Sequence, residues 1–258
     1  AAAFSLAIAN TAVMFFLLKY LVDAAHLTPA VAGTVLLVGK LWDAVSDPLV
    51  GRLSDRTKTS MGARRPWIAG GSMPFILLFG AIWWGMPLSG WAAAGAYAVL
   101  LVLYNTAYTA VVVPYGALTP VLTQDYDERT QLNAARMSWS MMGGIAAGIG
   151  LPMLRDITGE WGYAGAILGL LMIPGLVIML RTTRGLDIAP DEPVETPSMW
   201  TVLKVQAFRR TAALFLAAWS CIAVLSALVP FYVEHHLHAP HLVDALFAAI
   251  QISALVTI

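Results

Sequence analysis

Long apolar runs follow one another along almost the whole chain, and each is long enough to cross a lipid bilayer as a helix. Hydrophobic residues make up 59% of the chain and charged residues 12%, whereas about a quarter of an ordinary soluble domain is charged. We therefore predict an all-α membrane protein with about seven spans, over residues 4–22, 30–53, 67–86, 91–122, 132–154, 163–180 and 211–233. An eighth run starts by residue 242, and we expect the chain to be truncated within it.

A charged segment with three prolines, RTTRGLDIAPDEPVETPSMW, separates the sixth span from the seventh. Proline and mixed charge are typical of linkers. We therefore predict an N-terminal six-helix transmembrane bundle over residues 1–180 and a cytoplasmic linker over 181–208. The beginning of a C-terminal transmembrane bundle then follows over 209–258.

Basic residues collect in the loops after the second, fourth and sixth spans, whereas the loops on the other side hold only Arg155. Since short loops rich in lysine and arginine stay in the cytoplasm, we expect a cytoplasmic N-terminus in a multi-pass protein of the cell (inner) membrane. The formal net charge is zero, which gives no basic field for a nucleic-acid partner.

Aromatic residues near the expected span ends predict anchors at the membrane interface; they are Trp83, Trp84, Trp91, Trp161 and Tyr163. Glycines within the fifth span predict close helix packing; they are Gly143, Gly144, Gly148 and Gly150.

The second span contains KLWDAVSDPLVG, in which Lys40, Asp43 and Asp47 lie within about 60° of one another on a helix. Each ionisable group costs about 2.5 to 3.5 kcal/mol at the middle of a bilayer. This polar stripe, with Ser46 beside it, must therefore face protein or a water-filled cavity. Pro48 also leaves the carbonyl of Ala44 without its helical donor.

Two carboxylates one helical turn apart repel each other, which favours a cation or a shared proton between them. Oxygen ligands suit a hard cation such as Na⁺. The alternative is that Lys40 neutralises Asp43 and helps to tie helices together. A single salt bridge needs only one acid, so we favour the cation site.

The block WDAVSDPLVGRLSDRT, followed by GARRPW, resembles the second helix and following loop of the glycoside-pentoside-hexuronide:cation symporters. This family lies within the major facilitator superfamily. PYGALTPVLTQDYDERTQLNAAR, from Pro114 to Arg136, resembles the family's fourth-helix end and the loop after it. The resemblance implies a major facilitator-type six-helix N-terminal bundle and the start of a second bundle.

The resemblance further implies that Asp43 and Asp47 hold the coupling cation, Na⁺ or H⁺, with Ser46 and Thr109 as further ligands. We expect no other metal and no cofactor, since the sequence has no P-loop and no histidine deep in a span. Residues expected to bind the substrate are Asn10, Lys40, Asn105, Tyr108 and Arg136. For Asn105, hydrogen bonding within a buried helix interface is an equal alternative. Arg136 could instead extend back to the cytoplasmic surface.

The loop sequence GRLSDRTKTSMGARRPW resembles a signature of the superfamily between its second and third helices. The resemblance implies that Asp55, Arg56, Arg64 and Arg65 form gating ion pairs that favour one conformational state. The alternative is a basic loop that only sets membrane orientation.

Galactoside-type members carry an acid before the fourth-helix proline and a tryptophan after it, where this chain has Val112 and Gly116. We therefore expect symport of another sugar or glycoside by alternating access, in a monomeric protein that is not an enzyme. Alternatives are a lysolipid or other amphipathic substrate, for which Lys19 could contact an anionic head group, or a non-transporting scaffold. We favour pairing of Lys19 with Asp23.

Overall fold

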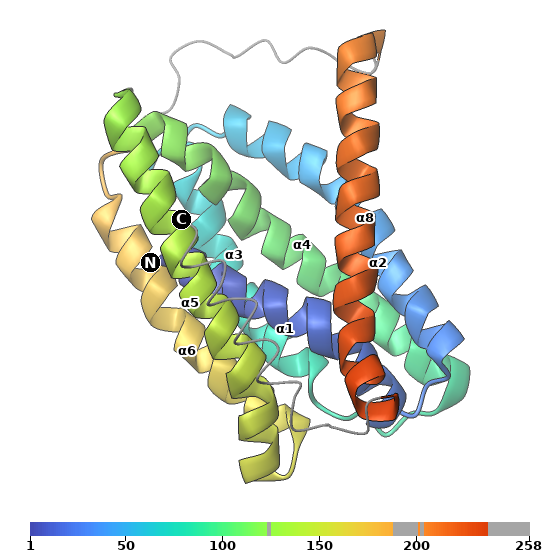
Figure 1. The fold of residues 1–258 in the computed structure, drawn as a ribbon. Helices are drawn as coiled ribbons and strands as arrows, with labels where there is room; N and C mark the ends of the chain where they lie inside the picture. Colours follow the sequence, from blue (N-terminus) through green and yellow to red (C-terminus); the bar gives the residue numbers. More distant parts are fainter. Residues whose placement is uncertain (123–124, 188–200, 202–203, 237–258) are drawn as a thin grey trace.

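The computed structural model describes residues 1–122, 125–187, 201 and 204–236. All the elements bounded within these ranges are helices (Figure 1): α1 Ala2–Asp23, α2 Pro29–Arg56, α3 Arg65–Ile82, α4 Gly90–Leu122, α5 Tyr126–Thr158, α6 Trp161–Thr182 and α8 Gln206–His235. Most of the expected linker and the whole of the eighth expected span lie outside the described residues.

Five of these helices, α1, α3, α4, α5 and α6, are long and apolar enough to cross a membrane. Helix α2 has 28 residues, or about 42 Å at about 1.5 Å per residue, but the ionisable residues of its second half lower its hydropathy. The chain is therefore an all-α, multi-pass integral membrane protein.

Helix boundaries differ from the expected ones where polar groups extend or stop a helix. Helix α5 starts at Tyr126 instead of residue 132, because the Asp125 carboxylate accepts hydrogen bonds from the backbone N–H groups of Asp127 and Glu128 at 2.9 and 3.0 Å. Helix α3 ends at Ile82, four residues early. Helix α4 continues through Pro114 to Leu122, where the fourth span was expected to end.

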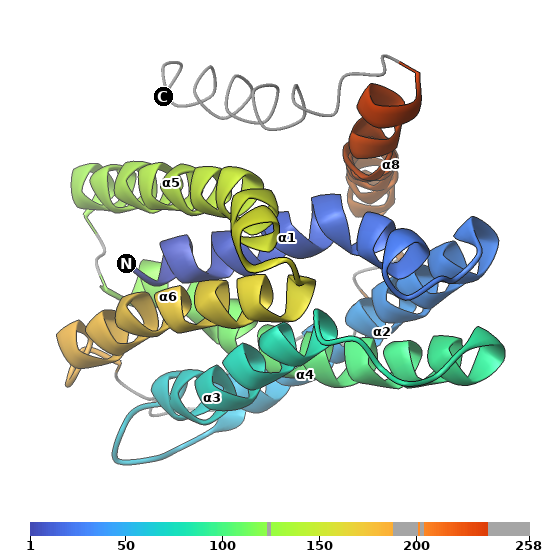
Figure 2. The same cartoon turned by 90° about the horizontal axis from the view of Figure 1, so that it is seen from below.

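Helix α1 runs through the middle of the bundle and packs against α5 and α6 (Figure 2). A side chain at Gly143 of α5 would overlap the backbone carbonyl of Phe4 and meet Ala7 Cβ at 3.0 Å. The Ser5 hydroxyl also donates to the carbonyl of Met172 on α6 at 2.7 Å. Close packing of α5 through its glycines is therefore confirmed at Gly143.

The expected role of Trp83 as an interfacial anchor is wrong, because its side chain is only 1% exposed. It stacks on Trp161 at 5.9 Å and meets the ring of Tyr20 at 5.5 Å. The Tyr20 hydroxyl lies 2.9 Å from that of Tyr97. These rings join α1, α3, α4 and α6. Trp91, another of the expected interfacial anchors, is in contrast 80% exposed.

Helix α4 organises the other half of the bundle. Both α2 and α3 pack along it, but they make little contact with each other. Asn105 of α4 donates to the carbonyl of Gly39 on α2 at 2.9 Å. A side chain at Gly39 would meet the Asn105 amide nitrogen at 3.1 Å, so this glycine permits the close approach of α2 to α4. The contact lies one turn before Asp43.

Candidate cation-binding site

The polar stripe of α2 faces α4. Asp47 Oδ1 accepts a hydrogen bond from Thr109 Oγ1 at 2.8 Å, and Asp43 Oδ2 lies 3.2 Å from Lys40 Nζ. Asp43 and Asp47 interact electrostatically with each other. The structure therefore brings together the two carboxylates and the threonine hydroxyl as one oxygen-rich cluster between two helices.

Two oxygens of this cluster have an unfilled hydrogen-bonding capacity. Asp43 Oδ1 and Ser46 Oγ are buried and have no hydrogen-bond partner within the part of the chain that the structure describes. A buried polar atom without a partner costs about 1 to 3 kcal/mol. A hard cation ligated by carboxylate and hydroxyl oxygens removes this cost, so the residues present fit a small monovalent ion.

Lys40 neutralises Asp43 only weakly. The ammonium group lies on a side chain that is 75% exposed, whereas the side chain of Asp43 is 23% exposed. Ion pairs that solvent screens contribute about 0 to 1 kcal/mol. Both residues also belong to α2, so this pair cannot tie two helices together as the alternative interpretation required.

The cluster extends from the interior of the bundle to its surface. Ser46 is 3% exposed, Asp43 is half-buried and Asp47 is exposed. Asp47 is therefore the most accessible carboxylate of the cluster, whereas Asp43 and Ser46 are more enclosed.

Two stacked tyrosines of α4 border the acidic cluster. Tyr104 is 2% exposed, and its ring stacks on that of Tyr108 at a centroid distance of 6.0 Å. Both phenols interact electrostatically with Asp43, and Tyr108 also interacts with Asp47. Sequence reasoning selected Tyr108 but missed Tyr104, although its position four residues earlier places it on the same helix face.

The other expected substrate residues lie on different helices. Asn10 is an exposed residue of α1. Arg136 of α5 donates from Nη1 to Thr119 Oγ1 at 2.6 Å, and its guanidinium lies 4.8 Å from the centre of the Tyr115 ring. These contacts hold Arg136 against α4, while the Asn105 amide is used in the helix interface with Gly39.

The loop between α2 and α3 forms an ion-pair network, and this network includes a residue that sequence reasoning missed. Arg64 Nη2 lies 3.0 Å from Asp55 Oδ1, and Arg65 Nη2 donates to the carbonyl of Leu180 at 2.6 Å. Asp187 Oδ2 accepts from the backbone N–H groups of Arg64 and Arg65 at 2.7 and 2.9 Å. In contrast, Arg56 is exposed and shows no ion pair among the residues that the structure describes.

Asp187 thus joins the end of α6 to the start of α3. Its side chain has no exposed surface, and it lies against Gly62, whose φ is +101°. A side chain at Gly62 would be strained in this conformation and would overlap Asp187. No sequence pattern identifies Asp187, because its partners lie more than 120 residues earlier in the chain.

Comparisons with known proteins identify related transporters. The family model described as MFS/sugar transport protein matches residues 1–258. An uncharacterized symporter of Synechocystis is 36% identical over 236 residues, which are 86% of this chain and 41% of that relative. The putative glycoside/cation symporter YagG of Escherichia coli is 35% identical over 67% of this chain and 39% of its own length.

A third relative is described as an animal lipid transporter. The sodium-dependent lysophosphatidylcholine symporter 1-B of Danio rerio is 35% identical over 193 residues, which are 74% of this chain and 34% of that relative. The chain therefore spans less than half the length of each of these relatives.

Proposed function

Because the chain belongs to the MFS/sugar transport protein family, we propose that its protein is a secondary active transporter that couples solute uptake to a cation. The observation that carries this proposal is the cluster of Asp43, Asp47, Ser46 and Thr109, in which two buried oxygens have no partner among the described residues. The proposed coupling ion is Na⁺ or H⁺.

In the proposed mechanism, the ion reaches Asp47 and is then held between the two carboxylates. Its charge removes their repulsion and satisfies the oxygens of Asp43 and Ser46 that have no partner among the described residues. Since Thr109 and both tyrosines lie on α4, ion binding also strengthens the contact between α2 and α4. The membrane potential supplies about 2.3 kcal/mol per charge per 100 mV for accumulation of the solute.

We propose that transport occurs by alternating access, in which two helix bundles rock against each other around a solute bound near the membrane centre. We assign residues 1–180 to the first bundle, 181–208 to a cytoplasmic linker and 209–258 to the start of the second. The ion pair of Arg64 with Asp55 and the contact of Arg65 with Leu180 support a gating role for this end of the bundle. From the basic loops we propose a cytoplasmic N-terminus, in a transporter that acts as a monomer in the cell (inner) membrane.

The proposed substrate is a sugar or glycoside that contacts Asn10, Tyr108 and Arg136, with Lys40 at the edge of the site. The identity to a putative glycoside/cation symporter supports this substrate class. Asn105 is better suited to positioning α2, because its amide already bonds to Gly39.

A lysolipid is the second candidate substrate. The Danio rerio relative is described as a lysophosphatidylcholine symporter, and α4 carries Val112 and Gly116 where a galactoside site has an acid and a tryptophan. The Lys19 ammonium does not favour this candidate, because it lies 2.8 Å from Asp23 on the same helix.

Uptake into proteoliposomes tests the proposal. The full-length protein is reconstituted, and labelled sugars, glycosides and lysophosphatidylcholine are offered with and without a Na⁺ gradient and at several external pH values. We expect ion-driven accumulation of one class, and its loss in the Asp43→Asn and Asp47→Asn variants. Asp156→Asn serves as a control, because Asp156 is exposed in a pair with Arg155. Uptake that no ion gradient drives, or the absence of uptake expected of a scaffold, would overturn the proposal.

A further inference from the structure

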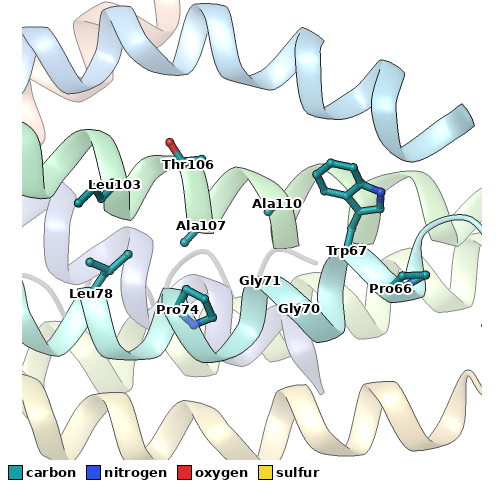
Figure 3. Close-up of a pocket in the computed structure, with 10 residues that line it drawn as sticks. All are labelled: Pro66, Trp67, Gly70, Gly71, Pro74, Leu78, Leu103, Thr106, Ala107 and Ala110. Carbon is teal, nitrogen blue, oxygen red and sulfur yellow. The ribbon is translucent and has the colours of Figure 1, made fainter. Parts of the chain in front are cut away.

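An apolar groove of about 510 Å³ lies between α3 and α4 (Figure 3). Its α3 side consists of Pro66, Trp67, Gly70, Gly71, Pro74 and Leu78. Four residues of α4, from Leu103 to Ala110, form its floor. The groove exists because α2 and α3 both pack on α4 without closing against each other.

The polar side-chain atoms that line this groove are already bonded within the protein. Trp67 Nε1 donates to Thr57 Oγ1 at 2.8 Å. Thr106 Oγ1 donates to the carbonyl of Val102 at 2.7 Å and accepts from Trp42 Nε1 at 2.8 Å. The groove thus offers hydrocarbon surface and suits an apolar chain rather than a sugar.

The length of the groove matches one leaflet of a bilayer. From Pro66 to Leu78 the helix rises about 18 Å, and half of the hydrocarbon core of a bilayer is about 15 Å thick. Trp67 at one end is joined to Thr57 at the end of α2, as expected for a tryptophan at headgroup depth. The groove therefore starts beside the 57–64 loop and extends along α3 as far as Leu78.

A basic residue stands at the headgroup end of the groove. Trp42 points from α2 to Thr106 in the groove floor, and Leu49 and Leu53 follow it on the same helix face at 55% and 45% exposure. Arg56 lies within about 40° of Trp42 on this face and is exposed. Its charge complements an anionic phosphate beside Trp67.

We propose that this groove binds one acyl chain of an anionic phospholipid, with the lipid phosphate at Arg56. The helix of the second bundle that the structure describes, α8, packs on α1 and lies across α1 from α3 in Figure 2. The groove thus faces away from α8. This site is independent of the coupled transport proposed above, because Asp43 and Asp47 lie on another face of α2.

Gly70 permits a direct test. No atom lies within 4 Å of the position that a Cβ would occupy there, so Gly70→Leu fills the groove without a clash at Cβ. Gly95→Leu is the matched control, since Gly95 also has open space at this position but does not line the groove. Arg56→Gln removes the headgroup charge from an exposed position and leaves the helix packing intact.

Native mass spectrometry of the full-length protein, offered phosphatidylglycerol or phosphatidylcholine, gives the readout. We expect phosphatidylglycerol to bind the wild type and Gly95→Leu equally, and to be lost from Gly70→Leu. Arg56→Gln should bind it about fivefold more weakly, the ratio that corresponds to about 1 kcal/mol per basic residue at an anionic surface.

Three results would overturn this site. They are retention of phosphatidylglycerol by Gly70→Leu at the wild-type level, equal binding of phosphatidylcholine by the wild type, and a dimeric mass that Gly70→Leu abolishes. The last would identify the occupant as a second copy of the chain.

Discussion

Thr109 links α4 to the acidic stripe of α2, because its hydroxyl donates a hydrogen bond to Asp47. The hydroxyl hydrogen points to Asp47 Oδ1 at 2.8 Å, and the side chain is 1% exposed. The hydroxyl oxygen keeps its lone pairs for an ion while its hydrogen orients the carboxylate.

Replacement of Thr109 by valine should weaken cation binding. Thr109→Val keeps the shape of the side chain but removes the hydroxyl, and a hydrogen bond to a charged group contributes about 1.5 to 3 kcal/mol. We expect the cation concentration for half-maximal uptake to rise about tenfold, as measured in proteoliposomes. Thr109→Ser, which retains the hydroxyl, should stay close to the wild type. Equal cation dependence of the valine and wild-type proteins would contradict a role for Thr109 at the site.

At the level of helices, Asp187 shows how a loop residue can determine where two elements meet. It caps the first turn of α3 through the backbone N–H groups of Arg64 and Arg65, and it lies five residues after the end of α6. Its carboxylate also lies 3.9 Å from Arg64 Nη1. The ends of α3 and α6 are therefore held together by one buried side chain.

Removal of this cap should destabilise the bundle. Asp187→Ala leaves two N–H groups without an acceptor, and we expect a loss of about 2 kcal/mol or more, seen as a lower unfolding temperature in a thermal denaturation assay. The unfolding temperature of Asp187→Asn should lie between those of the wild type and Asp187→Ala, because an amide oxygen still accepts hydrogen bonds. Asp156→Ala is the control, since the Asp156 side chain is 70% exposed. The same unfolding temperature for Asp187→Ala and this control would show that the cap contributes nothing.

For the whole molecule, the orientation proposed from the basic loops can be measured. Cys221 is the only cysteine of these 258 residues, so Cys221→Ala removes their thiol, and any cysteine elsewhere in the full-length protein is replaced in the same way. Met61→Cys and Leu88→Cys then place single thiols at positions that are 43% and 46% exposed on opposite ends of α3. A membrane-impermeant maleimide applied to intact cells should label Leu88→Cys and not Met61→Cys, and permeabilised cells should show both. Labelling of Met61→Cys in intact cells would reverse the proposed orientation.

The parts that could be predicted from the sequence depend on neighbours within one helix. The spacing of Asp43, Ser46 and Asp47 placed them on one face of α2, because helical periodicity is local. The pairing of Lys19 with Asp23 at 2.8 Å is confirmed for the same reason. The approximate positions of the apolar helices followed from their length and composition.

Other features could not be predicted from the sequence, because they depend on contacts between residues that are far apart in the chain. The burial of Trp83 needs Tyr20 and Trp161 from two other helices, and the cap at Asp187 needs backbone groups more than 120 residues away. Likewise, only the packing of α2 on α4 shows that the buried oxygens of Asp43 and Ser46 have no hydrogen-bond partner within the described ranges. Composition and periodicity determined that this chain forms membrane-spanning helices, because burial in lipid depends on the apolar content of each segment. Which side chains are paired, capped or left open was decided by tertiary structure, because a hydrogen bond requires a partner within about 3 Å and the sequence order does not supply that distance.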